Sequence, residues 1–342
     1  MYFASRKAML FVTSMFLALL VTGFGFSSYQ AAAFEKRNPN RGERIDVGGY
    51  RMNSVYVPRP NTADLPTLVF IHGASANLRD QMTAFRSKLE GRVDMLFLDR
   101  PGLGFSDRGG PQNAFPDGQA DAIAALMRKR GIKRAIIVSH SFGGAIAASF
   151  ALNHKDMVAG LLFLSPATHP WPGGIEWYYD AAKVPVFGWL FSTLVAPPVG
   201  MALIDNATKA VFAPNRRPDD YIEQTAACLS LRPRAFHNNA IDVANLLEYV
   251  KRVSPRYKEI QAPAVIITGD ADRVVLPEIH SRQLHADIAG SRLLRIHDLG
   301  HKPDYAVTDL AIAAIETLAG KKRNLEELAA QAEARIARGK AE

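Results

Sequence analysis

The stretch AIIVSHSFGG, residues 135–144, decides how the rest of this sequence is interpreted. Its leading apolar residues predict a buried strand, and its two glycines stand where a helix begins. A sharp turn between a strand and a helix projects the side chain of Ser141 into the open, beside the N–H groups at the start of the helix. Neighbouring elements approach such a turn closely, which requires small residues two positions before and after the serine. Gly143 meets that requirement, and Ser139 stands where the strict pattern has glycine.

Strand and helix patterns alternate on both sides of this turn, from residue 44 onward. Short apolar runs predict further strands at residues 68–73, 95–99, 161–165, 265–269 and from 293. Helical patterns separate them at about 78–90, 117–130, from 142, 278–285 and 304–318. The segment 43–57 has two adjacent glycines between its two short runs, which predicts an antiparallel hairpin at the sheet edge. The sequence therefore predicts an α/β fold with a mostly parallel sheet.

Three further groups of polar residues follow predicted strands, where open parallel sheets place their sites. The run HGAS begins at His72, after the first buried strand. Asp272 lies in TGDADRVV after the strand at 265–269, and His301 lies in DLGHKPDY after the last strand. The chain order serine, aspartate, histidine is the one expected when a nucleophile, an acid and a base act together in this architecture. Asp270 competes with Asp272 for the acid position.

Composition narrows the class of protein. The chain has 342 residues, of which 48% are hydrophobic and 22% charged, so it can bury a large core. A net charge of +8 without a run of five basic residues argues against nucleic acid as a partner. The single cysteine, Cys228, cannot form an internal disulfide, and no His or Cys spacing resembles a metal site. His280 and His285 are interpreted as surface residues.

With these motifs in order, the sequence resembles the α/β-hydrolase superfamily in its lid-bearing branch, over about residues 44–319. The resemblance rests on HGAS at 72–75, DRPGLGFSD at 99–107, SHSFGG at 139–144, GDADRVV at 269–275 and GH at 300–301. It implies the α/β-hydrolase fold, a mostly parallel sheet flanked by helices, with a helical lid inserted between two strands. No metal or organic cofactor is expected for this family.

The resemblance also assigns roles to single residues. Ser141 is the expected nucleophile, His301 the general base and later the acid, and Asp272 the carboxylate that orients the imidazole. Family pattern favours Asp272 over Asp270. The backbone N–H groups of Ala74 and Phe142 are the expected oxyanion hole. Structural roles are expected for His72, His140 and the residues of the 99–107 loop, among them Asp99, Gly102, Gly104, Ser106 and Asp107.

The amino-terminal segment predicts export. Arg6 and Lys7 precede an uncharged apolar run from Ala8 to Phe26, which spans about 28 Å as a helix. It is either a signal-anchor in the cytoplasmic membrane or a signal peptide cleaved after the alanines at 31–33, which would leave a secreted or periplasmic protein. Both alternatives place the remaining chain outside the cytoplasm. A buried helix of the globular part is a third interpretation.

The chain divides into five predicted parts. They are a signal-anchor or signal peptide at 1–33, a linker at 34–43, a hydrolase core at 44–167 and 261–320, a helical lid at 168–260 and a charged, solvated helical tail at 321–342. Aromatic residues are frequent in the lid, which indicates an apolar or ring-bearing substrate or, equally, packing of the lid onto the core. They are Trp171, Trp177, Tyr178, Tyr179, Phe187, Trp189, Phe191, Phe212 and Phe236.

The predicted activity is hydrolysis of a carboxylic ester or related acyl bond of an apolar small molecule, through an acyl-enzyme on Ser141. A serine nucleophile argues against epoxide hydrolases and haloalkane dehalogenases, which carry aspartate there. Carbon–carbon bond hydrolysis, acyl transfer and cofactor-free haloperoxidase activity remain open on the same motifs. So does a role as a non-catalytic ligand receptor.

Overall fold

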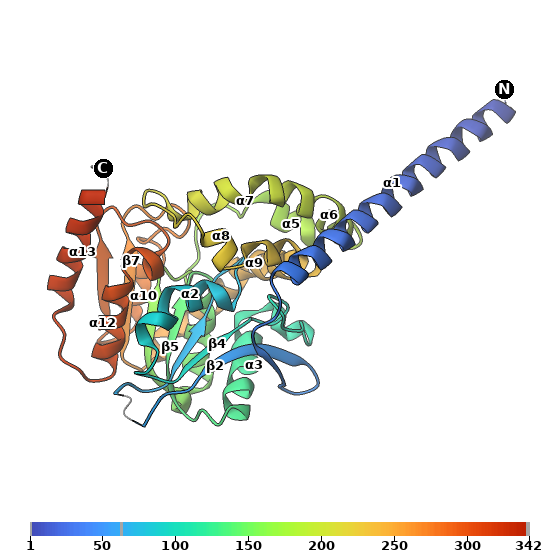
Figure 1. The fold of residues 1–342 in the computed structure, drawn as a ribbon. Helices are drawn as coiled ribbons and strands as arrows, with labels where there is room; N and C mark the ends of the chain where they lie inside the picture. The colour runs from blue at the N-terminus through green and yellow to red at the C-terminus, as the bar shows by residue number, and fades with distance from the viewer. Residues whose placement is uncertain (1, 62–63, 340–342) are drawn as a thin grey trace.

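The computed structural model describes residues 2–61 and 64–339, which form one sheet with helices on both faces and a long helix, α1, projecting from it (Figure 1). The strands are β1 Glu43–Asp46, β2 Arg51–Val57, β3 Leu68–Ile71, β4 Met95–Leu98, β5 Ala135–His140, β6 Val158–Leu164, β7 Ala264–Gly269 and β8 Arg292–Ile296. Their order in the sheet is β1-β2-β4-β3-β5-β6-β7-β8. The β1–β2 hairpin pairs antiparallel with β4, and the strands from β4 to β8 are parallel. The predicted α/β fold and the edge hairpin are confirmed.

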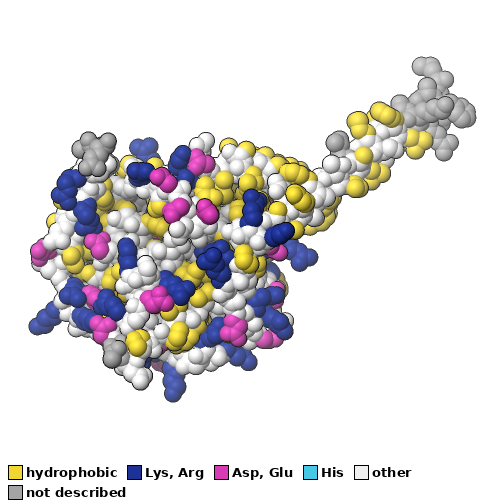
Figure 2. Space-filling view, in the orientation of Figure 1, with side chains coloured by type: hydrophobic (Ala, Val, Ile, Leu, Met, Phe, Trp, Pro, Cys, Tyr) yellow, Lys and Arg dark blue, Asp and Glu magenta, His cyan; other side chains and the backbone are white. Residues whose placement is uncertain are grey.

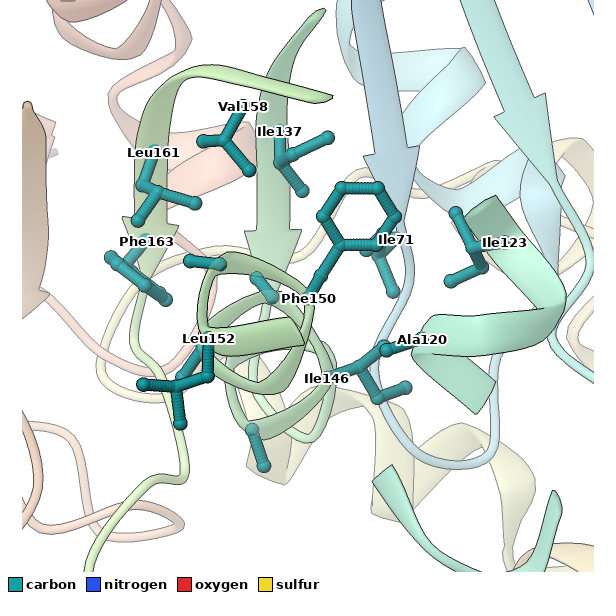
Figure 3. Packing of buried hydrophobic residues seen from close by; sticks show 14 of the residues in the cluster. Ile71, Ala120, Ile123, Ile137, Ile146, Phe150, Leu152, Val158, Leu161 and Phe163 are labelled. Carbon is teal, nitrogen blue, oxygen red and sulfur yellow. The ribbon is translucent and has the colours of Figure 1, made fainter. Parts of the chain in front are cut away.

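Hydrophobic packing covers both faces of the sheet. Around the sheet lie α2 Leu78–Leu89, η1 Pro111–Ala114, α3 Pro116–Lys129, α4 Gly143–Asn153, η2 Lys155–Met157, α10 Ser281–Asp287, α11 Pro303–Ala306, α12 Thr308–Leu318 and α13 Leu325–Gly339. Ile137 of β5 packs with Phe150 of α4 and Ile123 of α3 on one face (Figure 3). Its neighbours Ile136 and Val138 point to the opposite face, as the two-residue period of a strand requires. Central strands are thus apolar on both sides and hold the turn after β5 rigidly.

A helical insertion separates β6 from β7. It contains α5 Trp177–Lys183, α6 Phe187–Leu194, α7 Ala196–Phe212, α8 Tyr221–Gln224, η3 Ala227–Leu231, α9 Pro233–Val253 and η4 Ser254–Glu259. These helices gather on one side of the sheet, next to the base of α1 (Figure 1). The insertion coincides with the segment predicted as a lid, and that name is kept for it below.

The linker predicted at 34–43 is partly wrong. Helix α1 runs from Tyr2 to Arg37, through the alanines at 31–33 and the first four residues of the proposed linker. Phe34 is buried against Ala226, Leu229 and Leu231 of the lid. The helix continues because an aromatic side chain at its end gains a hydrophobic contact far away in the sequence, which a local charge pattern does not reveal.

The tail predicted as a solvated helix is also different. Helix α13 packs against β8 and α12, and its Leu325 and Ala332 are fully buried. Arg335 pairs with Asp309 of α12 at 2.7 Å across the edge of this contact. The apolar residues of α13 recur on one face, and that face covers the sheet. Residues 340–342, the end of the predicted tail, lie outside the described part of the chain.

Because Leu325 is fully buried, we expect Leu325→Ala to lower the free energy of unfolding by about 2–5 kcal/mol. Gln331→Ala changes an exposed residue of the same helix and should stay within about 0.5 kcal/mol of the native value. Chemical denaturation of both variants measures the difference. Equal stabilities would mean that α13 does not belong to the folded core.

Candidate active site

Ser141 occupies a strained turn between β5 and α4. Its φ is +54°, a left-handed conformation that is uncommon for a residue with a side chain. A Cβ added to Gly143 would lie 2.5 Å from the carbonyl oxygen of Ile71, so no larger residue fits there. Ser139 is buried in β5, and its hydroxyl donates to the carbonyl of Leu162 at 3.3 Å. The departure from glycine at this position is therefore accommodated inside the sheet.

Asp272 and His301 form a hydrogen-bonded pair beyond the ends of β7 and β8. The distance from His301 Nδ1 to Asp272 Oδ2 is 2.7 Å, and both side chains are buried. The other carboxylate oxygen, Oδ1, accepts the N–H groups of Val274 and Val275, each at 2.9 Å. Burial alone raises the pKa of Asp272, but the charge and hydrogen bond of His301 and these two N–H donors together hold the pKa below its usual value. Asp272 is thus ionised where it meets the imidazole.

Asp270 is placed elsewhere. Its Oδ2 lies 2.8 Å from Nδ1 of His297, which is an exposed residue, and its Oδ1 accepts the N–H of Asp298 at 2.7 Å. The structure therefore brings Asp272, and not Asp270, to His301.

His140, the residue before Ser141, contacts His301. The Nε2 atom of His140 lies 2.8 Å from the carbonyl oxygen of His301, and the two imidazole rings are 4.9 Å apart. Burial lowers the pKa of His140 far below its usual value, which keeps this ring neutral. The exposed fraction is 9% for Ser141 and 3% for His301, so both lie beneath the surface.

The HGAS loop lies against the nucleophile turn. A Cβ added to Gly73 would be 3.0 Å from Cβ of Ser141. Among the described residues, no hydrogen-bond acceptor faces the backbone N–H of Ala74 or of Phe142, the two predicted oxyanion donors. Next to Ala74, the backbone N–H of Ser75 donates to Oδ1 of Asn239 at 2.7 Å, and Asn239 Nδ2 donates back to the hydroxyl of Ser75 at 3.0 Å. The lid helix α9 thereby holds this loop.

The 99–107 loop has the structural role predicted for it. The carboxylate of Asp99 accepts the backbone N–H groups of Leu78 and Phe105 and the side-chain amide of Asn53, each at 2.8 Å. His72 also acts within the structure, since its Nε2 accepts the N–H of Arg100 at 3.1 Å.

Arg100 and Asp242 are two site-supporting residues that sequence reasoning missed. Arg100 is fully buried, donates to the carbonyl of Gly73 at 2.9 Å and to Asp242 of α9 at 2.8 Å, and lies 4.1 Å from the ring centre of Phe142. Burial lowers its pKa to about 10, which still leaves it charged at neutral pH. No local pattern marks such a pair, because the partners are 142 positions apart in the chain.

The expectation of two surface histidines is half wrong. His285 is exposed, but His280 is buried, and its Nδ1 accepts the N–H groups of Thr168 at 3.2 Å and His169 at 3.1 Å. Burial lowers the pKa of His280 to about 4, so it is neutral and holds the first turn of the lid segment.

A buried charge cluster lies behind His301. The ammonium group of Lys302 donates to Asp80 at 2.8 Å and to Asp304 at 3.0 Å, and lies 5.0 Å from the ring centre of Tyr305. Oxygen and nitrogen atoms of Asp80, Asp304 and His140 lie within 4.8 Å of one another, a grouping that could hold a cation. Lys302 already supplies that positive charge. Burial raises the pKa of Asp304 to about 6, although the lysine opposes this shift.

We expect Lys302→Met to destabilise the fold by about 3–5 kcal/mol, because it leaves two carboxylates buried without their cation. Lys322→Met, at an exposed position, is the matched control and should change stability little. Urea unfolding curves at pH 7 compare the two. A native-like Lys302→Met protein would show that the carboxylates are neutral or solvated.

The family follows from comparison with known proteins. A family model described as alpha/beta hydrolase fold matches residues 66–303, more than half of the chain, and the chain therefore belongs to this family of hydrolases. The 2-hydroxy-6-oxononadienedioate/2-hydroxy-6-oxononatrienedioate hydrolase of Klebsiella pneumoniae is 26% identical over 255 residues, covering 69% of this chain and 80% of that protein.

Solved structures show the same fold. An esterase from Exiguobacterium antarcticum matches with a TM-score of 0.64 at 20% identity, over 81% of this chain and 99% of that one. A membrane phospholipase A, described as a bacterial virulence factor, matches with a TM-score of 0.60 at 20% identity, over 94% of this chain and 100% of that one.

Proposed function

We propose that this protein is a serine hydrolase that cleaves a carboxylic ester or related acyl bond through an acyl-enzyme on Ser141. The observations that carry the proposal are the 2.7 Å hydrogen bond between Asp272 and His301 and the φ of +54° that holds Ser141 in a strand-to-helix turn, directly after His140, whose Nε2 lies 2.8 Å from the carbonyl oxygen of His301. This arrangement fits nucleophilic catalysis better than ligand binding alone, since a binding site needs no ionised carboxylate behind a buried imidazole.

The chemistry proceeds in two steps. His301 removes the hydroxyl proton of Ser141 as the serine oxygen bonds to the acyl carbon, and the backbone N–H groups of Ala74 and Phe142 stabilise the oxyanion. Transfer of that proton from His301 to the leaving alcohol breaks the ester bond and leaves the acyl-enzyme. His301 then takes a proton from water as the hydroxide attacks the acyl carbon. It returns that proton to the oxygen of Ser141 as the acyl bond breaks, which releases the acid and free Ser141.

Hydrolysis of p-nitrophenyl esters of increasing acyl length tests this function, with Ser141→Ala as the control. Activity that depends on Ser141 supports a serine hydrolase, and the preferred chain length describes the pocket under the lid. Absence of activity in folded wild-type protein would contradict ester hydrolysis.

Carbon–carbon bond hydrolysis is the second candidate, because curated relatives such as the Klebsiella pneumoniae protein are named as hydrolases of 2-hydroxy-6-oxo dienoates. Incubation with 2-hydroxy-6-oxo-6-phenylhexa-2,4-dienoate, followed by loss of its absorbance, distinguishes the two. Product analysis with added alcohols or peroxide separates acyl transfer and haloperoxidase activity from hydrolysis.

We further propose that α1 stays attached and anchors the protein in the cytoplasmic membrane, with the catalytic domain outside the cytoplasm. The segment Met9–Arg37 is long and apolar enough to cross a membrane. Its most apolar stretch of 18 residues has a mean hydropathy of 2.1, and no part of that stretch is buried inside the protein. Retention is supported because Ser27 donates to the carbonyl of Thr193 and the ring of Phe24 lies 4.9 Å from that of Trp189, so cleavage after Ala33 would remove both of these contacts with the lid. The side chains of Arg6 and Lys7 lie outside the described residues.

We expect the full-length chain to be recovered from the membrane fraction at its uncleaved mass, and to need detergent rather than high salt for release. Intact mass spectrometry of the purified protein measures this. A chain that begins at Phe34 and is found in the soluble fraction would contradict an anchor and support a signal peptide.

A further inference from the structure

The lid carries an exposed apolar surface next to α1. Its side chains are 37% to 74% exposed and are those of Val184, Val186, Phe187, Trp189, Val195, Val199, Met201 and Leu203. Residues 184–204 include no charged side chain, and Lys183 and Asp205 bound this stretch. We call these eight residues the lid apolar surface. Figure 2 shows hydrophobic side chains gathered where α1 leaves the lid, continuous with those along α1 itself. Water-soluble surfaces rarely keep so long a run of exposed apolar residues.

Helix α1 fixes the level of this surface relative to a bilayer. The rings of Phe24 and Trp189 are 4.9 Å apart, and a Cβ added to Gly23 would lie 2.7 Å from the side chain of Leu194. Both contacts fall near the end of the apolar run 8–26, whose helical length of about 28 Å matches the hydrocarbon layer. When α1 crosses the membrane, these contacts place α6 at the outer boundary of the hydrocarbon layer. Tryptophan is the residue typical of this boundary.

The two helices of the surface are amphipathic in a way that suits this position. Small and polar residues of α6, Gly188, Ser192 and Thr193, are buried against the protein, while Phe187 and Trp189 are exposed. Helix α7 follows at a bend of 57°, so the pair does not form one straight span. A bent pair with its large apolar residues outward lies in the interface plane more readily than it crosses a bilayer.

The same helices lead to the proposed catalytic site. Helix α6 packs on α9, and Ser192 of α6 is within 3.4 Å of His237 of α9. Asn239, two positions further along α9, holds Ser75 beside the oxyanion donor Ala74. Ser141 is only 9% exposed, and α9 of the lid holds the loop that lies against it, so we expect a substrate to pass the lid on its way to Ser141.

We propose that the lid apolar surface lies in the outer leaflet of the bilayer beside α1, and that Ser141 hydrolyses the acyl esters of lipids taken from that leaflet. The inference rests on the proposed serine hydrolase function. Continuity of the surface with α1 identifies a lipid bilayer as its occupant. In the reaction, the carbonyl carbon of the lipid ester bonds to Ser141, the lysolipid leaves with the proton carried by His301, and water releases a fatty acid from the acyl-enzyme.

The test uses the full-length chain in vesicles of phosphatidylethanolamine and phosphatidylglycerol. Val199→Asp/Leu203→Asp places two charges on the lid apolar surface. Ala207→Asp is the matched control, since it adds a charge at an exposed position of the same helix beyond the uncharged stretch. Each protein is assayed for fatty-acid release from the vesicles and for hydrolysis of p-nitrophenyl butyrate in detergent. A Trp171→Phe/Trp177→Phe protein retains Trp189 alone and reports its depth through quenching by brominated lipids.

The double variant is expected to lose about tenfold or more in lipid hydrolysis, because its lid no longer favours the bilayer, and to keep butyrate hydrolysis within about twofold. Ala207→Asp should match wild type in both assays, and Trp189 should be quenched by brominated lipids. Butyrate hydrolysis that depends on Ser141, with no lipid hydrolysis or no quenching of Trp189, would overturn the inference and leave the hydrolase function intact.

Two other outcomes are equally clear. If the double variant instead dissociates a dimer in detergent and Trp189 is not quenched in vesicles, the surface binds a second copy of the chain and the inference fails. If Ser141→Ala retains activity in both assays, the proposed hydrolase function itself fails.

Discussion

Ser141→Ala is expected to lower the turnover of a p-nitrophenyl ester by roughly 10⁴ to 10⁶, a loss of about 5–8 kcal/mol of transition-state stabilisation. The reason is that the variant has no oxygen to form the acyl-enzyme, while His301, Asp272 and the oxyanion donors stay in place. A residual rate above that of water should remain, because the N–H groups of Ala74 and Phe142 still stabilise an oxyanion. Steady-state kinetics, with active-site titration by a fluorophosphonate, measures both effects.

Folding is the control for this variant. Alanine removes one oxygen from a side chain that is 9% exposed and for which no hydrogen bond is recorded among the described residues, so the unfolding transition should move little. A stable variant that keeps native turnover would exclude Ser141 as the nucleophile. A variant that also loses its stability would leave the kinetic comparison without meaning, and Ser141→Gly would then replace it.

Local sequence patterns were enough to predict most of the fold. The run at 135–140 is buried on both faces, and buried parallel strands are continuous apolar runs that periodicity detects directly. The hairpin at 43–57 was equally visible, since two adjacent glycines adopt the positive φ angles of its turn. The end of α1 and the burial of α13 were not predicted, because the contacts of Phe34 and Leu325 join segments far apart in the chain.

The candidate site divides in the same way. Its proposed reacting groups lie in loops directly after strands, and short sequence motifs identify them. Its supporting groups could not be identified in this way, because each belongs to a pair that joins segments more than 140 positions apart. These pairs are Arg100 with Asp242, Ser75 with Asn239 and Lys302 with Asp80. In each case a polar residue that would be solvated in isolation is buried by a partner that no local pattern identifies.

The acid position offers a comparison of two neighbouring carboxylates. Asp272→Asn is expected to lower kcat/KM by about 10⁴, whereas Asp270→Asn should stay within about threefold of wild type. The reason lies in the hydrogen bonds of Asp272, whose Oδ1 accepts two N–H groups. An asparagine must place its oxygen there, so its NH₂ group faces Nδ1 of His301. That nitrogen then has to accept, and the proton moves to Nε2, where it prevents His301 from taking the proton of Ser141.

Asp270→Asn does not have this consequence, because Asp270 binds His297 and the N–H of Asp298 on the outer side of the same loop. Ester kinetics of both variants, together with ¹⁵N chemical shifts that report the tautomer of His301, tests the argument. Equal losses at both positions would mean that the loop as a whole, and not one carboxylate, fixes the orientation and tautomer of the His301 imidazole. Loss only in Asp270→Asn would move the acid to Asp270 and require the loop to rearrange before the reaction, since Asp272 is the residue that the structure places 2.7 Å from His301.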